Sequence, residues 1–352
     1  MEIKLKTKKM EHKIKLNGKH NLFIAYKLID VMRYELSGPV LDFAKNYVIT
    51  MRPYLLFVSG ITGIAGLALS PAVNIASVIL LSFCFFLTYG FGQALTDCFQ
   101  TDTDSISSPY RPLVSGKISR RGVFAVSLTG LSAIGAVVLS YSFAGFVLAV
   151  IASLGLATYT PFKRRWWGGP FYNAWIVAAL FTIAYLCFTP LAEFSFNVKY
   201  AGALAAVFFG YANFVLTGYY KDISADRETG YNTFPVVFGM KASSVVSDIF
   251  ALLMTASWFA VMYSTGFFTN PAIFAVLLSV SGLTVLVYSQ IMLHKVKDER
   301  YAYKAISPDV HAYILIIGSI AANARHEWGT AICLFYCGYV ITLKLRPMKE
   351  QI

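Results

Sequence analysis

Charged side chains are scarce in this chain. Only 14% of its 352 residues are Asp, Glu, Lys or Arg, while 57% are hydrophobic and the mean hydropathy is +0.60. An ordinary soluble domain carries about 25% charged residues. The shortage excludes a soluble globular protein and indicates a polytopic membrane protein.

Cysteine is equally sparse. The five cysteines are odd in number and lie mostly in apolar runs: Cys84, Cys98, Cys187, Cys333 and Cys337. Such positions are typical of buried free thiols, which behave as small hydrophobic side chains. A disulfide framework is therefore not expected, and the four-residue spacing of the last pair indicates helix packing rather than a redox or metal pair.

Residues 1–40 lack any apolar run and are rich in lysine from Lys4 to Lys19. The segment cannot span a membrane, and it does not resemble a signal peptide because no apolar core follows its basic start. We expect a basic cytoplasmic tail, which either binds anionic lipid or only fixes the orientation of the chain.

Apolar runs of spanning length follow this tail. They lie near residues 53–69, 75–95, 122–140, 143–159, 172–190, 200–219, 244–266 and 271–293. A last stretch, 309–343, would be about 50 Å long as one helix, so it contains either one tilted span with a surface segment or two short spans. We expect an all-α bundle of nine or ten transmembrane helices over residues 41–345, and a short tail at 346–352.

The loops between these runs differ in charge. Nearly all internal Lys and Arg residues lie in four of them, at 96–121, 160–171, 220–243 and 294–307. Cytoplasmic loops of membrane proteins are enriched in Lys and Arg, so these four are predicted to face the cytoplasm. The order helix, helix, acidic loop, helix, helix, basic loop occurs twice. This order predicts two pseudo-repeated four-helix halves with a shared site at their interface.

Two of the four loops carry aspartates close to a helix end. In the first, a continuous helix would place Asp97 and Asp104 within about 20° of each other and turn Asp102 away. In the second, Asp222 and Asp226 are four residues apart on one helical face. Mg²⁺ typically binds one or two carboxylates and fills its remaining positions with water and substrate phosphates. The two stretches therefore predict a magnesium site.

Basic residues accompany these aspartates. Arg111, Lys163 and Lys221 would neutralise a simple cation site, whereas mixed acidic and basic side chains suit a bound polyanion. Mg²⁺ together with Arg and Lys would make a diphosphate a better leaving group. The apolar part of such a substrate would lie between the helices, where the chain offers 28 Phe and 22 Tyr side chains whose ring faces also stabilise cations.

Four motifs occur in a fixed order: MRP at 51–53, SPYRPLVSGKIS at 108–119, YTPFK at 159–163 and KDISADRETGYNTFPVVFG at 221–239. On these motifs the chain, from about residue 50 to 240, resembles the UbiA superfamily of intramembrane prenyltransferases. The resemblance implies that the catalytic aspartates, which hold Mg²⁺ and diphosphate, are Asp97, Asp104, Asp222 and Asp226. It implies diphosphate contacts for Arg52, Arg111, Tyr159, Lys163 and Lys221.

Two positions depart from the family pattern. Thr96 stands where the family has Asn, and Gln100 stands where it has the middle Asp of the first motif. The amide oxygen of Gln100 can still coordinate Mg²⁺, but it lacks the charge that strengthens the bond. We expect Gln100 to be a weak metal ligand, with Asp102 compensating only if this segment is not a regular helix.

The residues and the resemblance together predict a Mg²⁺-dependent intramembrane prenyltransferase. Its expected partners are the lipid bilayer, a prenyl diphosphate, and an aromatic or hydroxyl-bearing lipophilic acceptor. We expect no nucleic-acid partner and infer no obligatory protein partner.

Three alternatives stay open. A UbiA-type terpene cyclase would quench the cation within its own chain, so its release of diphosphate would not depend on an acceptor. An organic-anion transporter would place charges at mid-depth, whereas these carboxylates lie at helix ends. A non-catalytic binding protein is compatible with the substitution at Gln100.

Overall fold

The computed structural model describes residues 3–7, 10–14 and 38–346. The chain divides into two units, one up to Asn46 and one from Tyr47 onward, and each is described by itself. In the first unit, strands β1 (Ile3–Thr7) and β2 (Met10–Ile14) pair antiparallel, with Ile3 opposite Ile14. This hairpin was not expected from the sequence. The rest of the predicted basic tail, apart from the helix that begins at Gly38, and residues 347–352 of the predicted C-terminal tail lie outside the described residues.

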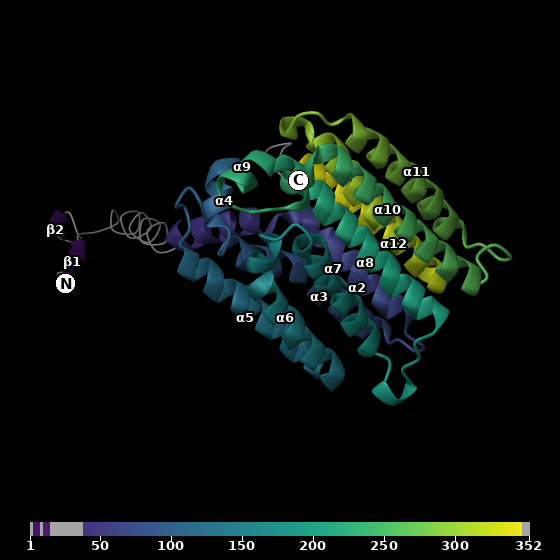
Figure 1. The fold of residues 1–352 in the computed structure, drawn as a ribbon. Coiled ribbons are helices and arrows are strands. Elements are labelled where there is room, and N and C mark those ends of the chain that lie inside the picture. The colour runs from purple at the N-terminus through teal and green to yellow at the C-terminus, as the bar shows by residue number, and fades with distance from the viewer. Residues whose placement is uncertain (1–2, 8–9, 15–37, 347–352) are drawn as a thin grey trace. The chain divides into compact units, whose positions relative to one another are not determined.

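The second unit is a helical bundle (Figure 1). Its helices are α2 (Leu56–Leu69), α3 (Ile75–Asp97), α4 (Thr101–Ser107), α5 (Arg120–Leu139), α6 (Phe143–Lys163), α7 (Gly168–Leu186), α8 (Val198–Gly218), α9 (Ile223–Glu228), α10 (Phe234–Ser264), α11 (Ile273–Lys295), α12 (Tyr303–Ala324) and α13 (Gly329–Lys344). Short 3₁₀ turns lie at η1 (Pro53–Leu55), η2 (Leu191–Glu193), η3 (Tyr219–Lys221), η4 (Glu299–Tyr301) and η5 (His326–Trp328).

The number of spans agrees with the prediction of nine. Within the described chain, eight helices are long and apolar enough to cross a membrane, and the count is nine when the pair Gly38–Met51 and Pro53–Leu69, bent by 47°, is taken as one span. The sequence left open whether 309–343 is one helix or two, and the structure contains two, α12 and α13, of which α13 has only 16 residues. An all-α, multi-pass membrane bundle is thus confirmed.

Arg325 explains the break between α12 and α13. Its guanidinium donates to the carbonyl oxygens of Ala68 at 3.2 Å and Ser70 at 2.6 Å, at the end of α2. The last carbonyls of a helix have no partner within that helix. Helix α12 therefore ends before Arg325, whose side chain caps the C-terminus of α2.

The predicted repeat is visible in the order of the elements. The first half runs α2, α3, short α4, α5, α6, and the second runs α7, α8, short α9, α10, α11. Two boundaries differ from the prediction. The acidic loop at 96–121 contains the helix α4. Helix α10 begins at Phe234, ten residues before the predicted 244, and its first turns are separated from the rest by the non-helical Gly239, which has φ of 78°.

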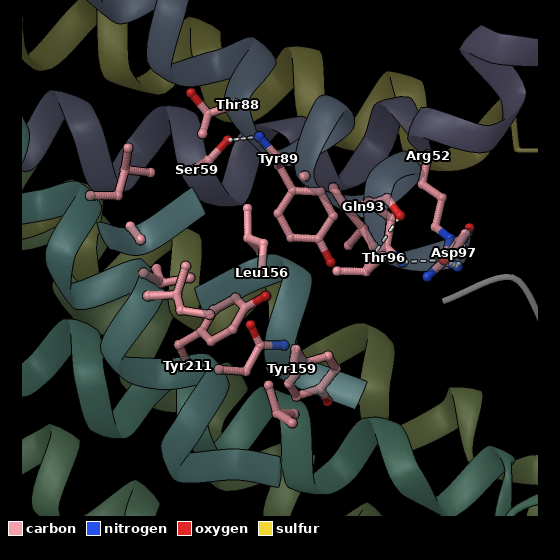
Figure 2. Close-up of a pocket in the computed structure, with 18 of the residues that line it drawn as sticks. Arg52, Ser59, Thr88, Tyr89, Gln93, Thr96, Asp97, Leu156, Tyr159 and Tyr211 are labelled. Atoms are coloured by element: carbon pink, nitrogen blue, oxygen red, sulfur yellow. Dashed lines mark hydrogen bonds and ion pairs between the residues drawn. The ribbon is translucent and has the colours of Figure 1, made fainter. Parts of the chain in front are cut away.

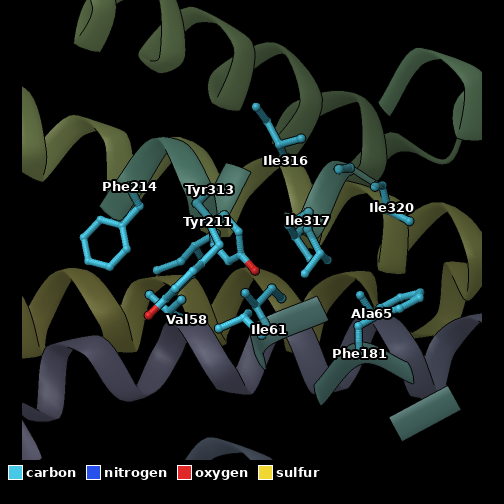
Figure 3. Packing of buried hydrophobic residues seen from close by; sticks show 14 of the residues in the cluster. Val58, Ile61, Ala65, Phe181, Tyr211, Phe214, Tyr313, Ile316, Ile317 and Ile320 are labelled. Carbon is cyan, nitrogen blue, oxygen red and sulfur yellow. The ribbon is translucent and has the colours of Figure 1, made fainter. Parts of the chain in front are cut away.

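The core joins the two halves through α2, α7 and α12. Figure 3 shows Ile61 and Ala65 of α2 facing Ile317 and Ile320 of α12, with Phe181 of α7 beside them. These side chains are all but fully buried. The contact brings the polar loop of one half close to that of the other.

The four basic loops meet at one end of the bundle, where α4 packs against α9 (Figure 1). Asn232 donates its backbone N–H to the carbonyl oxygen of Arg164 at 3.1 Å. Ser224 donates its backbone N–H to a carboxylate oxygen of Glu299 at 2.8 Å. The structure thus brings the four loops together, as predicted, while their exposure to the cytoplasm stays a prediction.

The cysteines are free thiols, as expected. Cys84, Cys98 and Cys187 are buried, whereas Cys337 is exposed, because it lies on the outward face of α13. The expectation of burial is wrong for that residue.

Gly66 on α2 is a site of close approach between the halves. A Cβ built there would overlap the carbonyl oxygen of Phe181 and lie 2.8 Å from the Cβ of Ala184. We predict that Gly66→Ala destabilises the bundle by about 1–3 kcal/mol, the usual cost of overpacking. Thermal unfolding in detergent measures the effect. Gly218→Ala is the control, because no atom of the described chain outside the local helix backbone and the neighbouring residues lies within 4 Å of a Cβ there. Equal melting temperatures for the two variants would contradict the prediction.

Candidate active site

The first acidic stretch is not a continuous helix. Asp97 is the last residue of α3, Gln100 has φ of −124° and ψ of 22°, and α4 begins at Thr101. Between them the backbone N–H groups of Cys98, Phe99 and Gln100 bond three residues back rather than four. Such tightening is common where a helix ends. The prediction of one regular helix over 96–104 is wrong, although Asp97 and Asp104 still reach the same cavity.

That cavity lies within the bundle and encloses about 1480 Å³, including its open mouth (Figure 2). Its polar end is lined by Arg52, Gln93, Thr96, Asp97, Gln100, Asp104, Arg111, Tyr159, Lys163, Lys221 and Asp222. Its apolar body is lined by Leu55, Phe85, Leu131, Ile134, Val138, Leu156, Ile176, Val177, Leu180, Ile183, Phe214 and Val215. Every predicted site residue except Asp226 therefore lines one cavity.

Each aspartate of the first motif is paired with an arginine. Arg52 Nη2 lies 3.0 Å from Asp97 Oδ1 and 3.1 Å from Oδ2, and Figure 2 shows the two side chains pointing at each other. Gln93 Nε2 also donates to Asp97 Oδ1, at 2.6 Å. Arg111 Nη1 lies 2.5 Å from Asp104 Oδ1. Because all four charged side chains are largely buried, these pairs are needed to offset the loss of hydration.

The Asp104 carboxylate is buried among basic side chains. Burial alone would raise its pKa, but the guanidinium groups of Arg111 and Arg52 and the ammonium of Lys163 outweigh burial and lower the pKa below its usual value. The same carboxylate raises the pKa of Arg111 against the effect of burial.

The second acidic motif divides its two aspartates. Asp222 precedes α9 and lines the cavity, whereas Asp226, within α9, is fully buried behind it. Lys163 Nζ lies 3.4 Å from Asp226 Oδ1, and Thr233 donates to Oδ2 at 3.2 Å. Burial raises the pKa of Asp226 to about 6, with Lys163 acting in the opposite direction. Because α9 begins only at Ile223, Asp222 and Asp226 do not lie on one helical face. The expectation that both carboxylates face the cavity is not met.

Lys163 connects the two motifs. It extends from the last turn of α6, where its Nζ lies 3.5 Å from Gln100 Oε1 as well as near Asp226. One turn earlier, the hydroxyl of Tyr159 lies 2.7 Å from that of Tyr219. The Gln100 oxygen expected to bind metal therefore accepts a hydrogen bond from Lys163.

Asp102 takes no part in the cavity. Its half-exposed carboxylate lies 3.1 Å from Arg164 Nη2, and Tyr231 donates to it at 3.2 Å. The prediction that Asp102 points away from Asp97 and Asp104 is confirmed. It does not compensate for Gln100.

Comparison with known proteins identifies the family. Residues 56–307 match the UbiA prenyltransferase family. The chain belongs to this family. It is thus an integral membrane enzyme of a class that transfers prenyl groups.

The UbiA-family chain has relatives among archaeal enzymes. It is 26% identical to the digeranylgeranylglyceryl phosphate synthase of Thermococcus kodakarensis over 284 residues. This alignment covers 79% of this chain and 98% of that protein. It is 28% identical over 214 residues to the enzyme of the same name from Thermococcus sibiricus, covering 59% of this chain and 74% of that one.

Solved structures share the fold. A UbiA homologue from Archaeoglobus fulgidus bound to DMAPP and Mg²⁺ aligns with a TM-score of 0.58 at 16% identity, over 79% of this chain and 99% of that one. The apo UbiA homologue from Aeropyrum pernix K1 aligns with a TM-score of 0.63 at 19% identity, over 75% and 96%.

The cavity of this UbiA-family chain suits Mg²⁺ only together with a phosphate. Among residues 38–346, no three His, Cys, Asp or Glu side chains gather as a ligand set. The available ligands are oxygen atoms, and Asp97 and Asp104 each face an arginine. Mg²⁺ commonly binds one or two carboxylates and completes its shell with substrate phosphates. The residues fit such a bridged ion.

Sequence reasoning missed two tyrosines. Tyr89 of α3 and Tyr211 of α8 line the cavity, and Figure 2 shows both near its centre with Tyr159. Residues three to four apart share a helical face, and Tyr89 precedes Gln93 and Asp97 at that spacing. Following the helical face of each aspartate motif toward the N-terminus of its helix would have identified Tyr89 and Tyr211.

The buried pair of Asp104 and Arg111 gives a stability test. We predict that Arg111→Leu costs about 3–5 kcal/mol because it leaves a buried carboxylate unpaired, whereas the double variant Asp104→Asn/Arg111→Leu costs far less. The exposed pair of Asp102 and Arg164 is the control, and Arg164→Leu should cost under about 1 kcal/mol.

Thermal unfolding in detergent at neutral and acidic pH measures these differences. Since the pKa of Asp104 is lowered in the folded protein, its stabilisation is present at neutral pH and is lost as the pH falls through that lowered value. An Arg111→Leu variant as stable as Arg164→Leu would disprove the pairing.

Proposed function

We propose that this protein is a Mg²⁺-dependent intramembrane prenyltransferase that moves a prenyl group from a prenyl diphosphate to a hydroxyl-bearing lipid. The observation that carries the proposal is that one cavity has both a charged end and an apolar body. A diphosphate fits the first and a prenyl chain the second. The relatives' name, digeranylgeranylglyceryl phosphate synthase, favours a glyceryl phosphate acceptor over an aromatic one.

The basic residues hold the diphosphate. Arg52, Arg111, Lys163 and Lys221 line the charged end. A guanidinium has five N–H donors, so Arg52 and Arg111 can bind phosphate oxygens while they keep their aspartates. Lys163 is already held in the cavity wall by Asp226.

The carboxylates Asp97, Asp104 and Asp222 would hold Mg²⁺ together with the diphosphate, and the amide oxygen of Gln100 would be a further ligand. The ion supplies Lewis-acid neutralisation of the leaving group when it is bound. We assign Asp226 to positioning Lys163, because it is buried away from the cavity.

The apolar body holds the prenyl chain and excludes water from the carbon that is attacked. Tyr89, Tyr159 and Tyr211 line the passage from the charged end to this body. Their ring faces favour positive charge, which develops on the allylic carbon as its bond to the diphosphate breaks.

The orientation in the membrane follows from loop charge. We place the end of the bundle that bears the four basic loops at the cytoplasmic face, because Lys and Arg are concentrated there.

The product decides the function. Purified protein in lipid nanodiscs receives Mg²⁺, geranylgeranyl diphosphate and a panel of glyceryl phosphate lipids and aromatic compounds. We expect an ether product, with one diphosphate released per ether. Aromatic products would overturn the acceptor class, and a cyclic hydrocarbon formed without acceptor would indicate a cyclase.

Substitutions of the two aspartates of the second motif should have different kinetic effects. Asp222→Asn should raise the Mg²⁺ concentration needed for activity, because Asp222 lines the cavity. Asp226→Asn should raise KM for the prenyl diphosphate about tenfold or more, because Lys163 loses its partner. Initial rates over a grid of Mg²⁺ and substrate concentrations separate the effects. Asp102→Asn is the control and should be close to the native enzyme; identical changes in both test variants would refute the assignment of Asp226.

Gln100→Asp tests the departure from the family pattern. Gln100 lines the cavity, and its Oε1 lies 3.5 Å from Lys163 Nζ. An added carboxylate near a divalent ion contributes a few kcal/mol at an effective dielectric constant of about 20. We predict that the variant saturates at a lower Mg²⁺ concentration than the native enzyme. An unchanged Mg²⁺ requirement in a folded variant would remove Gln100 from the metal site.

A further inference from the structure

A buried carboxyl group lies on the far side of α8 from the cavity. Tyr211 and Val215 on one face of α8 line the cavity. At steps of about 100° per residue, Asn213 and Thr217 lie on the opposite face. Both contact Asp309 of α12, whose residue surface is only 3% exposed.

Asp309 has no cationic partner. Asn213 Nδ2 donates to its Oδ1 at 2.8 Å, and Thr217 Oγ1 lies 3.1 Å from its Oδ2. Among residues 38–346, none of the ion pairs includes it. An unpaired negative charge within a membrane bundle is costly.

The hydrogen-bond geometry around Thr217 accommodates a proton on Asp309. Thr217 has one hydroxyl proton, and its Oγ1 lies 3.0 Å from the carbonyl oxygen of Phe214, which can only accept. When Thr217 donates to that carbonyl, its oxygen is left to accept from Asp309 Oδ2. The shared contact is satisfied if Asp309 is a carboxylic acid that donates to Thr217.

The same counting extends to α10 and α11. Ser247 Oγ lies 2.6 Å from Asn213 Oδ1 and 2.9 Å from the amide of Gln290, and it has one proton to give. The Gln290 Nε2 atom is buried without a partner in the described chain. The two ends of an amide are assigned from their partners, and turning this amide round lets its nitrogen donate to Ser247.

One directional chain of hydrogen bonds then connects these side chains. It runs from Gln290 to Ser247, to Asn213, to Asp309, to Thr217 and to the carbonyl of Phe214. The chain ties α8 to three neighbouring helices on the face that looks away from the cavity. Just beyond it, the Tyr220 hydroxyl donates to the carbonyl of Met240 at 2.5 Å, next to the non-helical Gly239.

We infer that Asp309 is a neutral carboxylic acid that acts as a positioning residue: it fixes the rotation of α8 so that Lys221 and Asp222, which follow this helix, face the cavity. Asp309 touches no substrate in this role. Its effect on activity rests on the proposed function, whereas its protonation is measured without any activity.

Infrared difference spectroscopy tests the protonation directly. The spectrum of the native protein minus that of Asp309→Asn at neutral pH should contain the C=O stretch of a carboxylic acid. A carboxylate band in its place would overturn the inference, whatever reaction the protein catalyses.

Substitutions test the positioning. Asparagine can accept a hydrogen bond from Asn213 and donate one to Thr217. Asp309→Asn should therefore keep kcat/KM within about threefold of the native value, a smaller change than the loss of one hydrogen bond would cause. Asp309→Leu breaks the chain and should lower kcat/KM by about tenfold to a hundredfold in folded protein, with a higher Mg²⁺ requirement because Asp222 is displaced. Asp248→Leu, which removes a carboxylate of α10 exposed beside His294, is the matched control and should change neither.

A second variant tests the positioning role if Asp309→Leu does not fold. Thr217→Val keeps the shape of the side chain and removes only the hydroxyl, so it should lower kcat/KM and raise the Mg²⁺ requirement in the same way. Native kinetics for folded Asp309→Leu or for Thr217→Val would overturn the positioning role. An Asp309→Asn variant as impaired as Thr217→Val would show that the charge of a carboxylate is required.

Discussion

Charge buried at the end of a membrane bundle must be neutralised, and this requirement organises the site. Three ion pairs do this: Arg52 with Asp97 and Lys163 with Asp226, which join segments far apart in the sequence, and Arg111 with Asp104 within one loop. These three cations, which we propose bind the diphosphate, are each held in place by a carboxylate before any substrate arrives. Removing one member would leave the other buried without a partner, which is far more costly than losing both.

One of these pairs lies at a break between two helices. Arg52 lies between Met51 and Pro53 with φ of 54°, the only non-glycine residue of the described chain with positive φ. Such a conformation costs energy and persists where surrounding contacts hold it. Here Arg52 lies at the 47° bend between the flanking helices, and its guanidinium pairs with Asp97.

Hydropathy and loop charge predicted the spans, the repeat and the meeting of the four loops, because these depend on composition over long stretches. The details that failed depend on where single helices begin. The spacing of Asp222 and Asp226 predicts a shared face only within one helix, but α9 starts at Ile223. Asp309 drew no attention in the sequence because its partners Asn213 and Thr217 are 96 and 92 residues away.

We propose that cations and carboxylates of one cavity hold a diphosphate jointly with Mg²⁺. Calorimetric titration of the purified protein with a non-reactive prenyl thiolodiphosphate, at a series of Mg²⁺ concentrations, tests it most directly. The account predicts tight binding that requires Mg²⁺ and is weakened in Arg111→Leu/Asp104→Asn. Binding of equal strength without Mg²⁺, or unchanged binding in that folded variant, would contradict it.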